Sequence, residues 1–361
     1  MIDVQSYMTE RIRDLMKNAY HHVLSNPRQA RFVSRMMRTF YNAERVRKEI
    51  QKSDGIEVPP FLIASMATAC NLHCKGCYAR ENGIASEEPT RTNLTPEQWR
   101  NIFDEAASLG VNFCLLAGGE PLSRRDVLEQ AAEVKNIIFP VFTNGTLIGH
   151  QYIDFFKRRM NIIPVISLEG QEQATDDRRG IGVYQRAMMS MKMMQREKIN
   201  FGISITVTTE NYRDVTAKDY IREMRELGCH LVFYVEYVPF DEQTAHLAFN
   251  DTHVDEMEKI VDNLREEFAD IIFLSFPGDE KALEGCLAAG RGFFHIAPDG
   301  AAEPCPFSPY SDCNVASIGL RKALQSPLFQ RIRDARALGW EHTGGCTLYE
   351  HRDEVEAMLT A

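Results

Sequence analysis

The alternation of short apolar runs with amphipathic stretches after Pro60 constrains the fold of this chain more than any other feature. Six runs read as buried strands: Phe61–Ala67, Asn112–Ala117, Ile138–Thr143, Ile162–Leu168, Phe201–Thr208 and Leu231–Val238. Five stretches between them predict helices: Pro96–Leu109, Arg124–Lys135, Gln151–Arg158, Val183–Glu197 and Asp214–Leu227. Strands joined by helical crossovers pair in parallel. The sequence therefore predicts an α/β fold with an open or partly closed barrel, whose active site lies at the carboxyl ends of the strands.

The two ends of the chain differ from this central pattern. Residues 6–52 show helical spacing of apolar residues, with 11 Lys and Arg against five Asp and Glu in the first 52 residues. From about Asp279, Cys, Gly and Pro become frequent, with a hairpin predicted over Phe293–Pro304 and a helix from Leu320 to about Leu338. We predict a basic helical arm over residues 1–55, a barrel over 56–278 and a small Cys-rich α+β domain over 279–361.

Composition narrows the classes of function. The net charge of −10 argues against general affinity for nucleic acid. No stretch approaches 18 uninterrupted apolar residues, and the start of the chain lacks the apolar core of a signal peptide, so we expect a cytoplasmic protein without a membrane span. Nine cysteines are an odd number, which favours reduced thiols over a disulfide framework. Cys114 and Cys229 fall in or beside predicted strands, where we expect small buried hydrophobic residues.

Three cysteines follow the first predicted strand in a C-x₃-C-x₂-C spacing: Cys70, Cys74 and Cys77. Three thiolates at this spacing can reach three corners of one iron–sulfur cluster, which usually takes four. One iron would then stay open to bind substrate, as a catalytic zinc keeps an open position. A zinc knuckle or a buried group of thiols is the alternative, and His73 within the triplet is expected to be solvated rather than a ligand.

A glycine-rich turn, Gly118-Gly119-Glu120-Pro121, follows the second predicted strand. Two glycines at the carboxyl end of a strand let a ligand approach the backbone closely, and Pro121 makes the exit rigid. Exposed carbonyl groups and the Glu120 carboxylate are acceptors suited to an ammonium group. Alone this could be an ordinary turn, but it lies one strand–helix unit after the cysteine triplet.

The cysteine triplet and the glycine turn together resemble the radical S-adenosylmethionine (SAM) superfamily, over roughly Phe61 to Val238. This resemblance implies a partial (βα)₆ barrel and a [4Fe–4S] cluster on the three cysteines, with SAM chelating the open iron. The glycine turn would seat the methionine moiety of SAM, and Tyr78 would lie near adenine.

Two further loops resemble family positions around ribose and methionine: Thr143-Asn144 after the third strand, and Ser167 to Glu169 after the fourth. The stretch Thr175 to Gly180 resembles an HDxxRG motif and makes Arg179 a partner for the SAM carboxylate. Glu169 stands where many relatives have Asp, and Thr175 where many have His. A solvated charged loop is the alternative for Arg178 and Arg179.

Four cysteines follow the barrel: Cys286, Cys305, Cys313 and Cys346. The segment from His295 to Cys305 resembles the G-x₄-C core of SPASM and twitch domains, which carry auxiliary iron–sulfur clusters. The chain lacks the C-x₂-C pair of a full SPASM pattern, so the resemblance implies a shortened domain with one auxiliary [4Fe–4S] cluster. Cys313 is the expected fourth ligand, although its spacing matches no known pattern. A structural zinc or free thiols are the alternatives.

The resemblance implies reductive cleavage of SAM to a 5′-deoxyadenosyl radical that removes hydrogen from a peptide or small-molecule substrate. It also implies a low-potential electron donor such as a flavodoxin or ferredoxin. The basic N-terminal arm could make peripheral contact with a membrane surface or an acidic partner, or it could simply pack on the barrel. A non-catalytic iron–sulfur or zinc protein for electron transfer or structure is the alternative function, but an electron carrier has no use for a SAM pocket.

Overall fold

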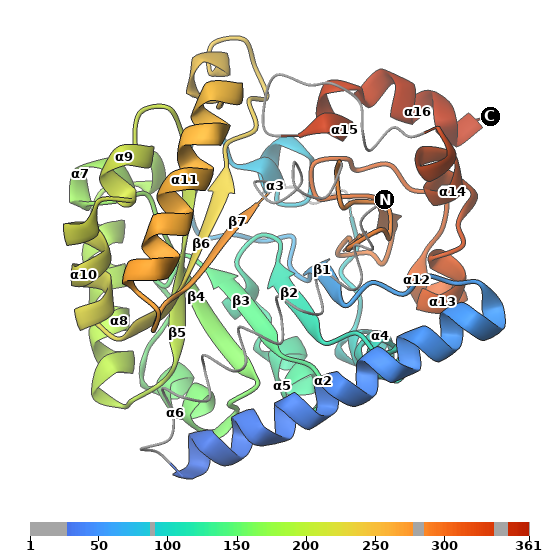
Figure 1. Cartoon of the computed structure of the whole chain (residues 1–361), viewed down its shortest axis with the longest axis horizontal. Helices are drawn as coiled ribbons and strands as arrows, with labels where there is room; N and C mark the ends of the chain where they lie inside the picture. Colours follow the sequence, from blue (N-terminus) through green and yellow to red (C-terminus); the bar gives the residue numbers. More distant parts are fainter. Residues whose placement is uncertain (1–26, 87–90, 277–284, 336–345, 361) are drawn as a thin grey trace.

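One mixed sheet organises the molecule, for which a computed structural model describes residues 27–86, 91–276, 285–335 and 346–360. Its strand order is β7-β6-β5-β4-β3-β2-β1-β8-β9 (Figure 1). The first six strands are β1 Phe61–Ser65, β2 Phe113–Ala117, β3 Phe139–Thr143, β4 Ile162–Leu168, β5 Phe201–Val207 and β6 Cys229–Glu236. They pair in parallel with their neighbours in the sheet. All six predicted strands are therefore confirmed, and with them the α/β class.

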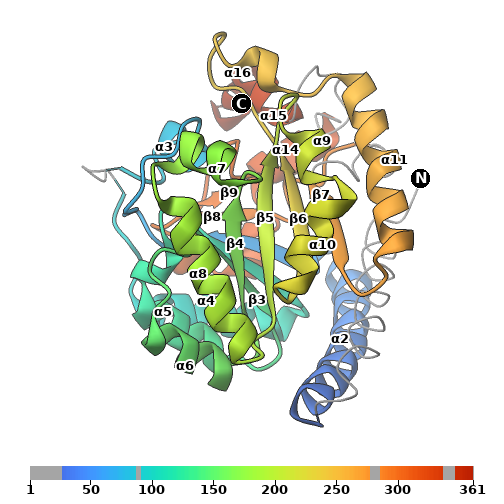
Figure 2. The same ribbon diagram turned by 90° about the vertical axis from the view of Figure 1, so that its left-hand side faces the viewer.

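The sheet curls on itself, as the predicted partial barrel requires. The rings of Phe142 and Phe233 lie 5.1 Å apart, although β4 and β5 separate their strands in the sheet. This contact crosses the concave side, and the crossover helices cover the convex side (Figure 2). These helices are α4 Pro96–Leu109, α5 Arg125–Glu133, α6 His150–Arg158, α8 Val183–Arg196 and α10 Lys218–Glu226. Helix α4 begins at a capping box between Thr95 and Gln98 and ends at Gly110 in the left-handed conformation.

Three elements differ from the sequence predictions. A seventh parallel strand, β7 Ile272–Phe276, follows α11 Asp251–Glu267; it was missed because an edge strand with one buried residue lacks a distinctive pattern. The predicted helix Asp214–Leu227 is two helices, α9 Tyr212–Val215 and α10, because Ala217 between them is extended. The predicted helix from Leu320 is wrong as a single element. It is split into α13 Leu320–Ala323 and α14 Pro327–Asp334, since Pro327 cannot continue a helix; residues 336–338 lie outside the described ranges.

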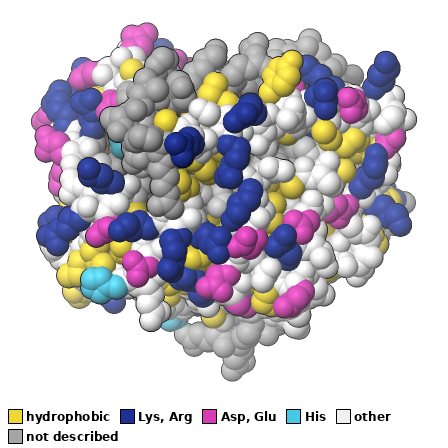
Figure 3. Space-filling model, turned by 90° about the horizontal axis from the view of Figure 1, so that it is seen from below, with side chains coloured by type: hydrophobic (Ala, Val, Ile, Leu, Met, Phe, Trp, Pro, Cys, Tyr) yellow, Lys and Arg dark blue, Asp and Glu magenta, His cyan; other side chains and the backbone are white. Residues whose placement is uncertain are grey.

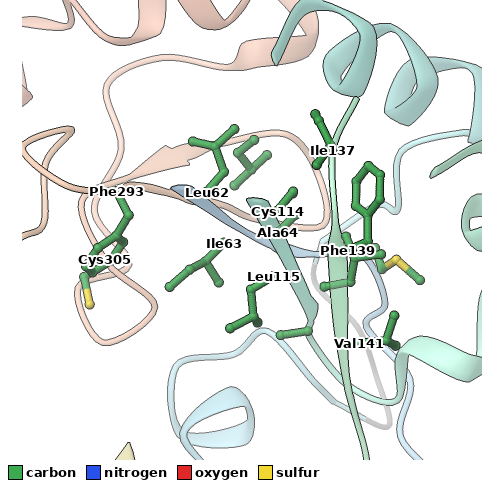
Figure 4. Packing of buried hydrophobic residues seen from close by; sticks show 14 of the residues in the cluster. Leu62, Ile63, Ala64, Cys114, Leu115, Ile137, Phe139, Val141, Phe293 and Cys305 are labelled. Atoms are coloured by element: carbon green, nitrogen blue, oxygen red, sulfur yellow. The ribbon is translucent and has the colours of Figure 1, made fainter. Parts of the chain in front are cut away.

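The predicted C-terminal hairpin is confirmed. Strands β8 His295–Ile296 and β9 Ala302–Glu303 pair antiparallel around a turn in which Gly300 has a φ of +88°. Strand β8 also pairs in parallel with β1, so the hairpin extends the sheet of the barrel. Figure 4 shows Phe293 and Cys305 beside Leu62 and Ile63 of β1. The remaining C-terminal helices are α12 Val315–Ile318, α15 Thr347–Glu350 and α16 Arg352–Thr360.

The described part of the N-terminal arm is one long helix, α2 Pro27–Asp54, which runs beneath the barrel (Figure 1). Its residues Val33, Met36 and Phe40 pack on Phe113 and Ile138, at the amino ends of β2 and β3. Farther along the helix, the buried Arg47 donates hydrogen bonds to the carbonyl of Gly110 and to Asn112. The helix therefore closes the end of the barrel opposite to the predicted site. The rest of the predicted arm, residues 1–26, lies outside the described ranges.

Candidate functional site

The three cysteines of the triplet lie on one loop between β1 and the short helix α3 Tyr78–Glu81. Their side chains are half-buried, and electrostatic interactions connect Cys70 with both Cys74 and Cys77. Burial raises the pKa of Cys70 to about 11 and also raises the pKa of Cys74. Both thiols are therefore protonated near neutral pH in the free chain, and metal binding must release their protons.

Side chains from two other strand ends hold this cysteine loop in place. Asn71 donates to Thr146 and accepts from Asn144, at 2.9 Å in each case. On the opposite side, the Arg178 guanidinium donates to the carbonyls of Lys75 and Gly76, at 3.1 and 3.3 Å. The loop is thus fastened across the mouth of the barrel, from the end of β3 to the helix that follows β4.

The glycine turn lies directly against the cysteine loop. The amide of Gly119 donates to the carbonyl of Ala67 at 2.7 Å, and that of Glu120 donates to Ala69 at 2.8 Å. A Cβ atom on Gly119 would lie 2.1 Å from the Ala69 oxygen, and Gly118 has a φ of +119°. Only glycine fits either position, because a side chain would push the two loops apart. The two motifs therefore lie against each other at the carboxyl ends of β1 and β2.

The Glu120 carboxylate connects the glycine turn to the end of β3. Its Oε1 accepts hydrogen bonds from the Thr143 hydroxyl at 2.6 Å and the Leu122 amide at 3.0 Å, and its Oε2 accepts from the Asn144 amide at 2.9 Å. The side chain is buried, and this burial raises the pKa of Glu120. Glu120 therefore aligns the predicted SAM loops, and Pro121 begins the buried turn η1 Pro121–Ser123 behind it. Its role as an acceptor for the SAM ammonium group stays a prediction.

Glu169, just after β4, is the centre of an arginine cluster. Its Oε1 accepts hydrogen bonds from Arg178 at 2.7 Å and from Arg179 at 2.5 and 2.8 Å, and the side chains of both arginines are largely buried. A solvated loop is therefore wrong for this pair. Arg179 also lies 4.0 Å from the Cys74 sulfur. The Arg179 guanidinium therefore contacts Glu169 and the cysteine loop. The predicted pairing of Arg179 with the SAM carboxylate stays a prediction.

The second carboxylate oxygen of Glu169 indicates that a ligand binds beside it. Glu169 is 3% exposed, and its Oε2 has no hydrogen-bond partner among the described residues. A buried carboxylate oxygen without a partner is costly in free energy, unless a ligand supplies the donor. Ser167, on the same strand, lies with its Oγ 3.1 Å from that of Ser204 on β5. The hydroxyl groups of the SAM ribose are donors of the kind that Glu169 lacks.

Tyr78 turns its side chain toward the C-terminal part of the chain. Its ring lies 5.3 Å from that of Phe307, and it interacts electrostatically with Cys77 and Cys305. Burial raises the pKa of Tyr78. The predicted position near adenine would therefore concern its backbone, whereas its side chain lies between the two cysteine groups.

Three of the four C-terminal cysteines come together. Cys305 interacts electrostatically with both Cys346 and Cys286, and all three are buried. Cys313 is half-buried, and the charged neighbour of its thiol is Asp312. Burial raises the pKa of the Cys313 thiol to about 12. The structure therefore groups Cys286, Cys305 and Cys346, and the assignment of Cys313 as a fourth ligand stays a prediction. Cys114 and Cys229 are fully buried, as expected.

Other residues at this edge were not predicted from the sequence. Glu236, at the end of β6, is a buried carboxylate. The next residue, Tyr237, packs against Gly76 of the cysteine loop and lies under the Arg178 guanidinium, 6.0 Å from its ring centre. Asn211 donates to the Glu169 carbonyl. A charged residue near the end of the predicted strand Leu231–Val238 was the available signal for Glu236.

The donor set fits a SAM-binding iron–sulfur cluster. Among the residues that the structure describes, no three His, Cys, Asp or Glu side chains converge closely enough to hold a single metal ion. A cubane cluster instead distributes its thiolates over separate iron atoms. The close approach at Gly118 and Gly119 and the unpartnered Glu169 oxygen both suit a bound cosubstrate beside such a cluster.

Comparisons with known proteins show which family this chain resembles. The family model for the Radical SAM superfamily matches residues 65–219. The AdoMet-dependent heme synthase of Methanosarcina barkeri is 25% identical over 81% of this chain and 89% of its own length. The PqqA peptide cyclase of Rhizobium meliloti is 26% identical over 69% of this chain and 68% of its own.

A solved structure has the same fold. SuiB of Streptococcus suis, bound to SAM, matches with a TM-score of 0.65 and 19% identity, over 81% of this chain and 72% of SuiB. SuiB with its precursor peptide SuiA matches with a TM-score of 0.57 and 18% identity, over 80% and 68% of the two chains. From the match to the family model, from its relatives and from the site that its residues form, residues 65–219 of this chain belong to the radical SAM superfamily.

Proposed function

We propose that the chain cleaves SAM at a cluster on Cys70, Cys74 and Cys77, and carries one auxiliary cluster on Cys286, Cys305 and Cys346, with Cys313 as its fourth ligand. The observation that supports this most is the contact between the cysteine loop and the glycine turn through Ala67 and Ala69. When bound, the cluster and SAM supply a single electron and a breakable C5′–S bond, which yield methionine and a 5′-deoxyadenosyl radical that abstracts hydrogen.

The protein's own part is to bind and orient. The glycine turn offers backbone groups at close range, and Glu120 fixes it to Thr143 and Asn144. The Glu169 Oε2 accepts a hydrogen bond from the bound cosubstrate. Because these groups are buried and held by several strand ends, they fix the reacting atoms and exclude water.

The substrate is either a peptide or a small molecule. The relatives include enzymes for both classes, a heme synthase and a peptide cyclase. We propose that it enters at the same edge, near the buried Glu236. The electron donor would be a flavodoxin or ferredoxin, and thiol ligands that must stay reduced fit a cytoplasmic location. Among the described residues, no helix is long and apolar enough to cross a bilayer.

The test is anaerobic reconstitution of the full chain, followed by iron and zinc counting and by measurement of 5′-deoxyadenosine after reductant and SAM are added. We expect about two cubane clusters per chain. Replacing Cys70, Cys74 and Cys77 with Ala should abolish nucleoside release and leave the C-terminal cluster. Replacing the buried Cys229 with Ala is the control and should leave both clusters. Zinc in place of iron would instead support the non-catalytic alternative.

A second proposal concerns the basic helix α2. Arg31, Arg35 and Arg38 line a hollow of about 960 Å³ together with Lys135 and Arg158, and Figure 3 shows a row of Lys and Arg side chains across this underside. No ion pair neutralises Arg31, Arg35 or Arg38 among the described residues, so this face could contact anionic lipid headgroups. Replacing the three arginines with Glu should abolish cosedimentation with phosphatidylserine vesicles at low salt. No binding by the native chain would exclude such contact.

A further inference from the structure

A buried hydroxyl group close to Cys305 has no hydrogen-bond partner. Ser308 is 1% exposed, and its Oγ has neither a donor nor an acceptor among the residues that the structure describes. A hydroxyl group that leaves water without gaining a new hydrogen bond costs free energy, and most buried polar side chains of native proteins are paired. The Ser308 hydroxyl therefore indicates that a bound group accepts its hydrogen bond.

A tight turn places this hydroxyl on the same side as the Cys305 thiol. The Ser308 amide donates to the Cys305 carbonyl at 3.0 Å, and the two residues face each other in an antiparallel bridge. Side chains of residues directly opposite each other in such a bridge lie on one face, with their Cβ atoms about 5 Å apart. Pro306 occupies the corner after Cys305, where its fixed φ favours a turn. The hydroxyl and the thiol are therefore held next to each other.

A backbone hydrogen bond brings the Cys286 loop to this turn. Ala289, three residues after Cys286, donates from its amide to the Pro304 carbonyl at 3.1 Å. Ala289 is fully buried and has a φ of +53°, a left-handed conformation that costs free energy in a residue other than glycine. The surrounding contacts therefore hold the Cys286 loop against the residue that precedes Cys305.

Aromatic rings bring Cys346 to the same turn. The Phe240 ring lies 6.4 Å from that of Phe307 and 4.9 Å from that of Tyr349. Phe307 directly precedes Ser308, and Tyr349 lies three residues after Cys346. All three cysteines of the C-terminal group are buried. Three thiols and one unpartnered hydroxyl group therefore share this part of the interior.

We propose that the Ser308 hydroxyl donates a hydrogen bond to an inorganic sulfide of the auxiliary cluster and thereby raises the reduction potential of this cluster. The inference rests on the proposed function, because it assumes that Cys286, Cys305 and Cys346 hold a cluster. The groups present fit such a cluster, since thiolates and sulfides only accept hydrogen bonds and the hydroxyl is a donor. A hydrogen bond to sulfur stabilises the reduced, more negative cluster, so its potential rises.

The test uses the reconstituted full chain in which Cys70, Cys74 and Cys77 are replaced with Ala, so that the electron paramagnetic resonance (EPR) signal comes from the C-terminal cluster alone. In this background, Ser308→Ala should keep the iron content and lower the midpoint potential. We expect the equilibrium constant of reduction to fall about tenfold, which is about 59 mV for one electron. In deuterated buffer, pulsed EPR should detect an exchangeable deuteron that Ser308→Ala removes.

Ser190→Ala is the matched control. Ser190 is also buried, but its hydroxyl donates to the Gly145 carbonyl at 2.8 Å, on α8 and outside the C-terminal part of the chain. This variant should leave the potential and the deuteron signal unchanged. The melting temperature of the iron-free full chain gives a second comparison. Ser190→Ala should lower this temperature because a hydrogen bond is lost, whereas Ser308→Ala should not, since its hydroxyl has no partner to lose.

An unchanged potential and an unchanged deuteron signal in Ser308→Ala, with the cluster present, would overturn the inference and leave the proposed function standing. An equal loss of melting temperature in the iron-free Ser308→Ala and Ser190→Ala chains would also overturn it, because the Ser308 hydroxyl would then have a partner within the chain. A native chain that assembles no C-terminal cluster would overturn the proposed auxiliary cluster as well.

Discussion

Single residues at the strand ends of this protein serve as connectors. Glu120 joins the glycine turn to Thr143 and Asn144, and Glu169 joins two arginines to the cysteine loop. Both carboxylates are buried, so each of their hydrogen bonds is stronger than it would be in water. The precision of the site therefore depends on a few fully buried polar atoms.

Gly119 tests the contact between the two loops. In Gly119→Ala the new methyl group would lie 2.1 Å from a backbone oxygen, so we expect at least a tenfold loss of SAM affinity, measured by equilibrium dialysis with the reconstituted protein. Gly149→Ala is the control, because a Cβ atom there meets nothing within 4 Å. Equal affinities in the two variants would show that the loops do not need this contact.

The thermal stability of the protein should depend on pH through the Asp176 carboxylate. Hydrogen bonds from the backbone amides of Tyr184 and Gly182 lower the pKa of Asp176 below its usual value of 3.8, and these bonds hold the start of α8. A lowered pKa in the folded state means that the carboxylate stabilises the fold above about pH 4 and loses this effect as the pH falls. Asp176→Asn should therefore lower the melting temperature at pH 7, with a difference that narrows below pH 4.

Asp177→Asn is the matched control for this pH experiment, because the Asp177 carboxylate bonds, within the described part of the chain, to the side chain of Gln173 alone. It should leave the melting temperature nearly unchanged across the same range. A gap between Asp176→Asn and the native chain that stays constant from pH 7 to pH 3 would contradict the assignment.

Among the elements, the long helix α2 depends on one buried cation. Arg47 is 4% exposed and satisfies the Gly110 carbonyl at the end of α4 as well as Asn112 before β2. The same helix presents an apolar side to the amino ends of the strands. This combination explains why a highly charged segment packs on the barrel.

Arg47→Met should lower the free energy of unfolding by about 3 kcal/mol, because it leaves buried acceptors without a donor. Arg45→Met, two residues earlier, removes an exposed ion pair with Glu49. This substitution should change the free energy of unfolding by less than about 0.5 kcal/mol. Urea unfolding of both variants measures the difference. Equal midpoints would mean that α2 is held by its apolar contacts alone.

The elements also show how far the sequence predicts this molecule. Strands such as β4 and helices such as α4 were predicted to the residue, because apolar runs and caps are local signals. Strand β7 was missed because its pattern is that of a half-exposed edge. The pairing of His295 with Ser65 joins positions 230 residues apart, and no local pattern encodes it. The cysteine triplet was predictable as a group, whereas the grouping of Cys286, Cys305 and Cys346 depends on how the chain folds back at the hairpin.

At the scale of the whole molecule, the two ends of the barrel are distinct. The cysteine loop, the glycine turn and the arginine cluster meet at the carboxyl ends of the strands, and α2 covers the amino ends (Figure 1). The hairpin brings the second group of cysteines, Cys286, Cys305 and Cys346, to the β1 side of the barrel through the shared sheet. One continuous sheet thus connects the two groups of cysteines.

The most direct test of this account is the EPR spectrum of the anaerobically reduced protein with and without SAM. We predict that SAM changes the spectrum of the native chain and of Cys305→Ala, since both retain a three-cysteine cluster with one open iron, and changes nothing in Cys74→Ala. Identical spectra of the native protein in the presence and absence of SAM would contradict it.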